Sequence, residues 1–357
     1  MEKLKIGVIA GTGYPANPNN YGSETMLAVL AEEFGKMGHD VTLIAAARSM
    51  KSPYYKLKLL PVTYGELNYT IESSVLTYLD ELLECDYVID ASPLQMFTEH
   101  IWFWQRDWLK NHVLVYYRNG FSSFNPRPPV NYAVHGVWLS NSAVKHMQPI
   151  KLPKELTHVI PYGIPEWYKP GKIREDYCLY LGAPRKEKGI FTILEVAKQL
   201  PDQRFVFAWR AISKEHKKTE EKWLKRADKL KNVEFVELPE GENHLKTKIR
   251  LYQRAKAFIQ LIEPNYIEAF GLAISETLAC GTPVILMNRE CHKELFSGIA
   301  YFVNGVKDAV KIIKRDEWPT PEQCYEFVKQ NYSTRKYADN FLKLYREVKY
   351  ARRDKTR

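Results

Sequence analysis

Cysteine is scarce in this chain of 357 residues, and the spacing of the few cysteines excludes two classes of protein. The five cysteines form no C-x-x-C pair, so the sequence predicts neither a disulfide framework nor a zinc site and fits a reducing compartment. No apolar run approaches the ~20 residues of a transmembrane helix. The first apolar run, residues 6–10, is too short for a signal peptide. We therefore expect a cytoplasmic protein.

The charge balance favours anionic partners without naming one. The chain has 52 Lys and Arg residues against 42 Asp and Glu residues, a net charge of +10. Such an excess suits phosphates, nucleic acid or acidic lipid heads. The positive residues are spread along the chain, however, so solvated surface charge is the preferred interpretation. A non-catalytic protein that binds nucleic acid stays an alternative.

Short apolar runs alternate with helical patterns, which predicts an α/β fold with parallel sheets. A length of 357 residues suits two domains of about 150 residues each. We expect Rossmann-like domains at residues 1–166 and 167–333, followed by a helix and basic tail at 334–357. The expected strands are 4–10, 40–46, 87–92, 113–117, 138–143 and 159–163, then 177–182, 205–209, 233–238, 257–262 and 283–287. The expected helices are 23–38, 190–200, 213–230 and 334–352.

The stretch IAGTGYPANPNNYGSE, which begins at residue 9, resembles a dinucleotide fingerprint but lacks its structural context. Gly11 and Gly13 fit G-x-G-x-x-A, yet the fingerprint needs a helix that starts inside the glycines. Pro15 and Pro18 delay the helix until Ser23, which we expect as its N-cap. The second strand also ends without the acidic residue that binds a ribose. NAD binding is therefore not expected, and the loop leads either to a ligand-binding helix N-terminus or to an ordinary capped helix.

The most informative stretch is EPNYIEAFGLAISETLACGTPVI, from residue 263. Glu268 and Glu276 are separated by seven residues, with a tight turn between them that opens a helix. Glu268 is expected in the loop before that helix and Glu276 about one turn inside it. Carboxylates suit vicinal sugar hydroxyls, and free N–H groups at Gly271 and Leu272 suit a diphosphate. For two glutamates alone, a helix cap and a solvated side chain would be the simpler interpretation.

This stretch closely resembles the E-x7-E segment of retaining GT-B glycosyltransferases, in particular glycosyltransferase family 4 (glycosyl transferases group 1). Four other segments resemble segments of this family and follow one another in the same order: NNYGSETMLAVLAEEF, GHDVTLIA, HVIPYGIPEWYKPG and YLGAPRKEKGI. The resemblance implies a GT-B fold, in which two Rossmann-like domains face each other across a cleft. It also implies that the C-terminal helix crosses back to the N-terminal domain.

The resemblance implies roles for individual residues. Glu276 matches the glutamate that binds the ribose of a nucleotide donor, and Glu268 matches the one that contacts the donor sugar. Lys188 matches the lysine that neutralises the departing diphosphate. The backbone and side chains that would line the donor sugar and its phosphates are Gly22, Ser23, Phe270, Gly271 and Leu272.

One departure from the family pattern concerns the leaving group. Where the family has an arginine after its glycine, this chain has Ala183. We expect Arg185 and Lys188 to hold the diphosphate together, with Arg118 reaching across the cleft and Arg210 as the next candidate. A solvated loop charge is the alternative for Arg185. The chain has no D-x-D motif, so a site without metal or cofactor is expected, in which cations stabilise the leaving group.

The predicted function is transfer of a hexose from a nucleotide diphosphate sugar, UDP- or GDP-linked, with retention of the anomeric configuration. The acceptor would be a hydroxyl of a sugar, a glycan or a lipid-linked molecule, and no nucleic-acid partner is expected. A nucleotide-sugar epimerase is the alternative enzyme. The aromatic run IWFWQRDW with the basic tail could dock on the inner membrane face. The favoured interpretation is that Trp104 and Trp108, at spacing i, i+4, are core residues.

Overall fold

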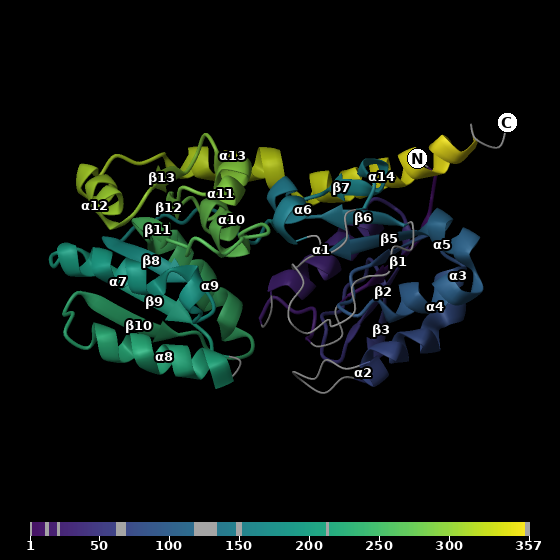
Figure 1. Cartoon of the computed structure of the whole chain (residues 1–357), viewed down its shortest axis with the longest axis horizontal. Helices are drawn as coiled ribbons and strands as arrows, with labels where there is room; N and C mark the ends of the chain where they lie inside the picture. Colours follow the sequence, from purple (N-terminus) through teal and green to yellow (C-terminus); the bar gives the residue numbers. More distant parts are fainter. Residues whose placement is uncertain are drawn as a thin grey trace. The chain divides into compact units, whose positions relative to one another are not determined.

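A computed structural model describes residues 2–10, 14–19, 22–61, 69–117, 134–147, 152–211 and 214–353. The chain divides into two compact units (Figure 1). The first unit is Met1–Gly163 with Tyr332–Arg357, and the second is Ile164–Asn331. Each unit is an α/β layer structure built on one parallel sheet, as expected from the alternation of apolar runs and helical patterns.

The sheet of the first unit has the strand order β3-β2-β1-β4-β5-β6-β7. Every described pair in it is parallel. Because β1 pairs with both β2 and β4, the strand order reverses beside β1, where open sheets of this kind bind ligands. The strands are β1 Lys5–Ile9, β2 Asp40–Ala46, β3 Lys56–Leu60, β4 Tyr87–Asp90, β5 Val113–Tyr117, β6 His135–Trp138 and β7 Thr157–Val159.

The last helix of the chain belongs to the first unit, where it packs on α1. Thr334 donates a hydrogen bond from Oγ1 to Glu33 Oε2 at 3.2 Å, and Tyr345 stacks on Tyr87 at 4.5 Å between ring centroids. The α-helices of this unit are α1 Gly22–Lys36, α2 Tyr69–Ser73, α3 Leu79–Leu83, α4 Met96–Trp104, α5 Arg106–His112, α6 Asn141–Met147 and α14 Thr334–Arg353. Short 3₁₀ turns occupy Ser74–Tyr78 and Lys154–Leu156.

The sheet of the second unit has the strand order β10-β9-β8-β11-β12-β13. Its strands are β8 Tyr177–Leu181, β9 Arg204–Trp209, β10 Val233–Glu237, β11 Ala257–Gln260, β12 Val284–Met287 and β13 Tyr301–Val303. Its helices are α7 Ile190–Gln199, α8 Lys214–Ala227, α9 Asn243–Arg254, α10 Leu272–Ala279, α11 Glu290–Phe296, α12 Val306–Arg315 and α13 Pro321–Tyr332.

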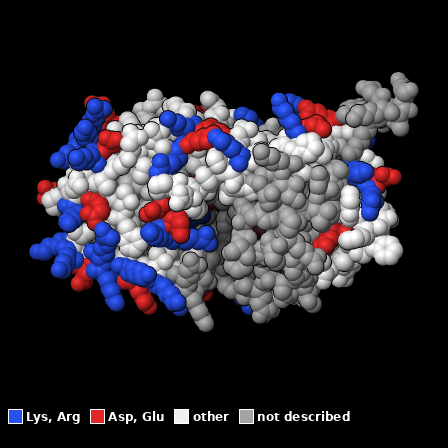
Figure 2. Space-filling model, viewed as in Figure 1, with Lys and Arg blue, Asp and Glu red and all other residues white. Residues whose placement is uncertain are grey.

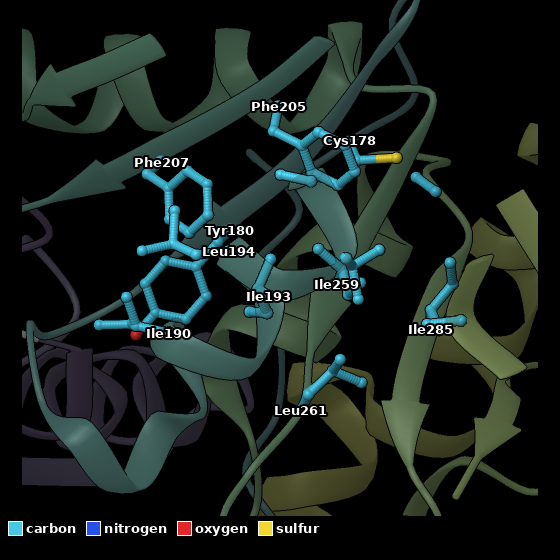
Figure 3. Packing of buried hydrophobic residues seen from close by; sticks show 14 of the residues in the cluster. Cys178, Tyr180, Ile190, Ile193, Leu194, Phe205, Phe207, Ile259, Leu261 and Ile285 are labelled. Atoms are coloured by element: carbon cyan, nitrogen blue, oxygen red, sulfur yellow. The ribbon is translucent and has the colours of Figure 1, made fainter. Parts of the chain in front are cut away.

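The core of the second unit lies between α7, α8 and the sheet. Figure 3 shows Ile190, Ile193 and Leu194 from α7 beside residues of β8, β9 and β11. Trp223 from α8 is fully buried and meets Trp209 edge-on at 5.0 Å between ring centroids. This close packing fixes the strands, and therefore also fixes where the loops at their carboxyl ends begin.

Most of the expected strands and helices are confirmed, with differences at the edges. The segment 138–143 is not a strand, because β6 ends at Trp138 and α6 begins at Asn141. The segment 159–163 is also not a strand, since β7 ends at Val159. Ser23 is not an N-cap but the second residue of α1, and its hydroxyl bonds Glu24 Oε2 at 2.8 Å. Gly11 and Gly13 lie outside the described residues.

The assignment of Trp104 to the core was wrong. Its side chain is 76% exposed, and that of Phe103 is 69% exposed. The spacing i, i+4 misleads here because α4 ends at Trp104, and Gln105 leaves the helical conformation (φ −141°, ψ 60°) before α5 begins. Trp108 is half-buried and stacks on His112 at 4.7 Å.

Three further features concern the surface and the cysteines. No helix in the described part of the chain is long and apolar enough to span a membrane. In Figure 2, Lys and Arg side chains alternate with Asp and Glu on the face shown, and the positive side chains gather most densely over α8. All five cysteines are buried and free.

Candidate active site in the second unit

Two loops at the carboxyl ends of β8 and β11 meet in the second unit. Glu263 donates its backbone N–H to Glu187 O at 3.0 Å. Gly189 has φ +79°, and a Cβ on it would lie 1.7 Å from Leu261 O. Only glycine therefore permits this approach. The contact holds the loop that carries Lys188 against the loop that carries Glu268.

Lys188 and Glu268 form a buried ion pair between these loops. Lys188 Nζ lies 2.5 Å from Glu268 Oε2, and the two side chains are 16% and 12% exposed. The lysine ammonium also lies 4.7 Å from the centroid of the Tyr266 ring. Burial alone would lower the pKa of Lys188, but the charge of Glu268, together with Tyr266 and the hydrogen bonds to both side chains, raises the pKa above its ordinary value. The lysine is therefore a permanent cation of the site.

Both hydrogen bonds to the Glu268 carboxylate are made to the same oxygen atom, Oε2. Gln260, at the end of β11, donates from Nε2 to the same Oε2 at 3.3 Å that Lys188 contacts. No hydrogen bond of the described residues reaches Glu268 Oε1. Since an ionised carboxylate accepts at both oxygens, Oε1 is available to a ligand hydroxyl.

Glu276, on α10, is clamped by three donors. Tyr168 donates to Oε1 at 2.8 Å, Lys248 donates to Oε1 at 3.0 Å, and Tyr252 donates to Oε2 at 3.0 Å. Burial, together with the charge of Glu276, raises the pKa of both tyrosines well above the ordinary value, so both stay protonated donors. Nearby, burial and the charge of Lys248 lower the pKa of His244 to about 4.

The two candidate arginines point to different partners. Arg185 donates from Nε to Nε2 of the buried His216 on α8 at 3.2 Å. Arg210 follows β9 directly, is 12% exposed, and contacts Glu240 Oε1 at 2.5 Å. The charges of both Arg185 and Lys188 act on Tyr266, where they oppose the rise in pKa that burial causes. Arg185 and Lys188 therefore share one neighbourhood, while Arg210 belongs to the neighbourhood of His244.

The turn that opens α10 is built around Gly271. This residue has φ +79°, and a Cβ on it would lie 2.8 Å from Ile274 Cδ1. The Phe270 side chain is 2% exposed, so it is a packing residue and only its backbone can meet a ligand. Leu272 is half-buried and is the first residue of the helix. Helix N-termini of this kind attract anions.

The remaining expected site residues lie outside the second unit. Gly22 and Ser23 begin α1 in the first unit. Arg118 lies outside the described residues. No cluster of three His, Cys, Asp or Glu side chains suited to a metal ion occurs in the described ranges.

Sequence reasoning missed the residues that hold Glu276. Tyr168 lies 108 residues from Glu276 in the chain, and Lys248 lies 28 residues from it. One local signal was present, because Lys248 and Tyr252 are four residues apart and therefore share a helix face. The helix that carries them, α9, was not among the expected elements.

The architecture is that of GT-B glycosyltransferases, so the expected fold is confirmed. AviGT4, a glycosyltransferase of avilamycin A biosynthesis, is 18% identical with a TM-score of 0.73, and the match covers 98% of each chain. A glycosyltransferase from Rickettsia africae is 14% identical with a TM-score of 0.69, covering 98% of this chain and 99% of that chain. Anabaena Alr3699/HepE, solved with UDP and glucose, is 13% identical with a TM-score of 0.72, covering 96% and 99%.

A comparison with family models finds a match for the second unit. Residues 166–330 match the model of the family described as Glycosyl transferases group 1. A search of curated proteins finds no significant match. The family match covers the unit that holds Lys188, Glu268 and Glu276. Together with the shared fold, it supports glycosyl transfer from a nucleotide sugar.

Proposed function

We propose that the protein transfers a hexose from a UDP- or GDP-linked donor to an acceptor hydroxyl with retention of the anomeric configuration. The observation that carries the proposal is the pair of buried glutamates, each held by a lysine, on the loop and helix that follow β11. Each of the two carboxylates can accept a hydrogen bond from a ligand hydroxyl. The helix N-terminus that lies between them in the sequence can bind phosphate.

Each group has a part in holding the donor. Glu276 accepts a hydrogen bond from the ribose, and the open Oε1 of Glu268 accepts one from the donor sugar. Because Lys188 and Glu268 neutralise each other, the diphosphate needs further positive charge. Arg185 and the N–H groups at Gly271 and Leu272 supply it, so no metal ion is needed.

Retention follows from reaction on one face of the sugar. The bond from the anomeric carbon to the diphosphate oxygen breaks, and the bond to the acceptor oxygen forms on the same side. The departing phosphate oxygen takes the acceptor proton. The protein lowers the barrier by stabilising negative charge on the diphosphate and by orienting donor and acceptor.

A lipid-linked acceptor would bring the protein to a membrane surface. Phe103 and Trp104 are the most exposed large apolar side chains described, and Arg106 stacks over the Trp102 ring at 4.5 Å. Aromatic side chains beside cations suit a lipid headgroup region. Co-sedimentation with anionic vesicles tests this contact, and Trp104→Ser should abolish it. Equal sedimentation of both proteins, or none at low salt, would remove the membrane from the proposal.

Thermal stabilisation by a panel of nucleotide sugars tests the proposed function. A ligand at 100 times its Kd adds about 2.7 kcal/mol of stability, and one donor should do so. Glu276→Gln should lose roughly ten- to a hundredfold in affinity for that donor, as expected for a lost charged hydrogen bond. The matched control is Glu326→Gln, which alters an exposed ion pair with Lys329 and should bind normally.

Two results would favour the alternative functions. Conversion of the donor to an isomer without any acceptor would indicate an epimerase. Binding of nucleic acid with a steep salt dependence, together with no response to any nucleotide sugar, would indicate the non-catalytic alternative.

A further inference from the structure

The hydrogen bonds of Glu276 leave few acceptor positions open. A carboxylate offers about four lone-pair positions, two on each oxygen. Oε1 already accepts from Tyr168 at 2.8 Å and from Lys248 at 3.0 Å. Among the residues that the structure describes, Tyr252 is the one donor to Oε2, at 3.0 Å. One position therefore remains, and it is on Oε2.

The three donors are not easily exchanged for solvent or ligand. The side chains of Glu276 and Lys248 are 4% and 11% exposed, and both tyrosine rings are buried. Removing a buried donor leaves a charge or lone pair without a partner, which is costly. We therefore expect Glu276 to keep these three hydrogen bonds when a ligand binds.

Displacement of Lys248 from Oε1 is the obvious alternative, and the surrounding charges oppose it. The ammonium lies 5.4 Å from the Tyr168 ring centroid, which favours its present position. His244, one turn before Lys248 on α9, and Arg210 lie close enough to act on each other's surroundings. The charges of Lys248 and Arg210 already lower the pKa of His244 there. Leaving Oε1 would separate the ammonium from the buried carboxylate that it pairs with at 3.0 Å, and a buried cation without its partner is costly.

We propose that Glu276 holds the donor ribose through a single hydroxyl, at Oε2, and that Lys248 is the positioning residue that makes this recognition one-sided. The proposal rests on the proposed function, because it takes the ligand of Glu276 to be a ribose. Two vicinal hydroxyls usually suit the two oxygens of one carboxylate; here Oε1 is saturated before the ligand binds. The protein should therefore distinguish the 2′ from the 3′ position of the ribose.

The first experiment uses the unaltered protein and two analogues. Calorimetry compares UDP with 2′-deoxy-UDP and 3′-deoxy-UDP, or the GDP set if GDP is the nucleotide that binds. One analogue should bind within about twofold of the parent, and the other should bind roughly ten- to a hundredfold more weakly. Equal weakening by both analogues would overturn the proposal. If neither parent nucleotide binds, the proposed function fails and this inference fails with it.

The second experiment tests whether Lys248 acts through Glu276. Lys248→Met should weaken binding of the parent nucleotide, because the carboxylate loses its orientation. It should barely change binding of the analogue that lacks the bonded hydroxyl, so the two losses should not add. A merely structural defect would weaken parent and analogue by the same factor, and that result would remove Lys248 from the proposal.

Two further variants complete this test. Lys248→Arg keeps the cation and should restore the preference for one hydroxyl. Lys246→Met is the matched control, because Lys246 is an exposed lysine on the same helix and its loss should leave both affinities unchanged. If Lys248→Met does not fold, Lys248→Arg and the analogue comparison still decide the claim.

Discussion

Gly189→Ala should separate the two loops that form the site. An added Cβ would lie 1.7 Å from Leu261 O and 2.2 Å from Leu261 C. Both are backbone atoms, so no side-chain rotation relieves the clash, and the loops must move apart. Left-handed backbone (φ +79°) costs a residue with a side chain roughly 1–2 kcal/mol. The hydrogen bond from Glu263 N to Glu187 O at 3.0 Å is then lost, at about 0.5–1.5 kcal/mol.

The expected loss of stability is therefore on the order of 3 kcal/mol, before any cost of repacking. Gly298→Ala is the matched control. Gly298 also has positive φ (+89°), but nothing lies within 4 Å of its Cβ position, so it should lose only the backbone cost of roughly 1–2 kcal/mol.

Urea unfolding followed by tryptophan fluorescence measures both variants, and nucleotide-sugar affinity is measured beside it. Gly189→Ala should be the less stable of the two, and it should also bind donor more weakly because Lys188 and Glu268 no longer meet. If both variants lose the same stability and bind donor equally well, contact between the loops does not build the site.

Three other variants make separate predictions. Glu268→Gln keeps the side-chain volume but removes the charge opposite Lys188, so turnover should fall while affinity for the free nucleoside diphosphate stays the same or rises. A matching loss in both would place Glu268 at the nucleotide. Arg185→Ala should lower kcat by roughly 10²–10³ if its guanidinium stabilises the leaving group, whereas a wild-type rate would mean that it is a solvated charge. Folding lowers the pKa of His244 from 6.5 to about 4. Between pH 4 and pH 6.5, the unfolded chain therefore binds more protons at this residue than the folded chain does. Stability should therefore rise with pH from 4 to 6.5, by roughly 3 kcal/mol at most, and thermal melts of His244→Asn should lack this part of the slope.

The fold was predictable because the strands at the centre of each sheet are short apolar runs. β8 and β11 are buried along their whole length, as strands covered by helices on both faces should be. The loop-and-helix placement of Glu268 and Glu276 was also predictable, since Gly271 (φ +79°) and Gly281 (φ +81°) adopt the backbone that glycine favours at the two ends of α10.

What could not be predicted depends on contacts between distant parts of the chain. Gln260 and Tyr168 carry no local sign that they hold a carboxylate, because each finds its partner only when β11 and the segment after Gly163 are in place. α9 was missed for a different reason. Its buried positions are His244, Lys248, Leu251 and Tyr252, so two basic side chains interrupt the apolar pattern that predicts a helix.

The most direct test of the account is proton NMR of the protein with its donor and an acceptor in buffer that contains EDTA. The account predicts release of the nucleoside diphosphate together with a new anomeric signal of the same configuration as the donor. Loss of turnover in EDTA would contradict the site without metal, and an inverted anomer would contradict retention. Turnover of no nucleotide sugar at all would contradict the central claim that the second unit is the donor site of a glycosyltransferase.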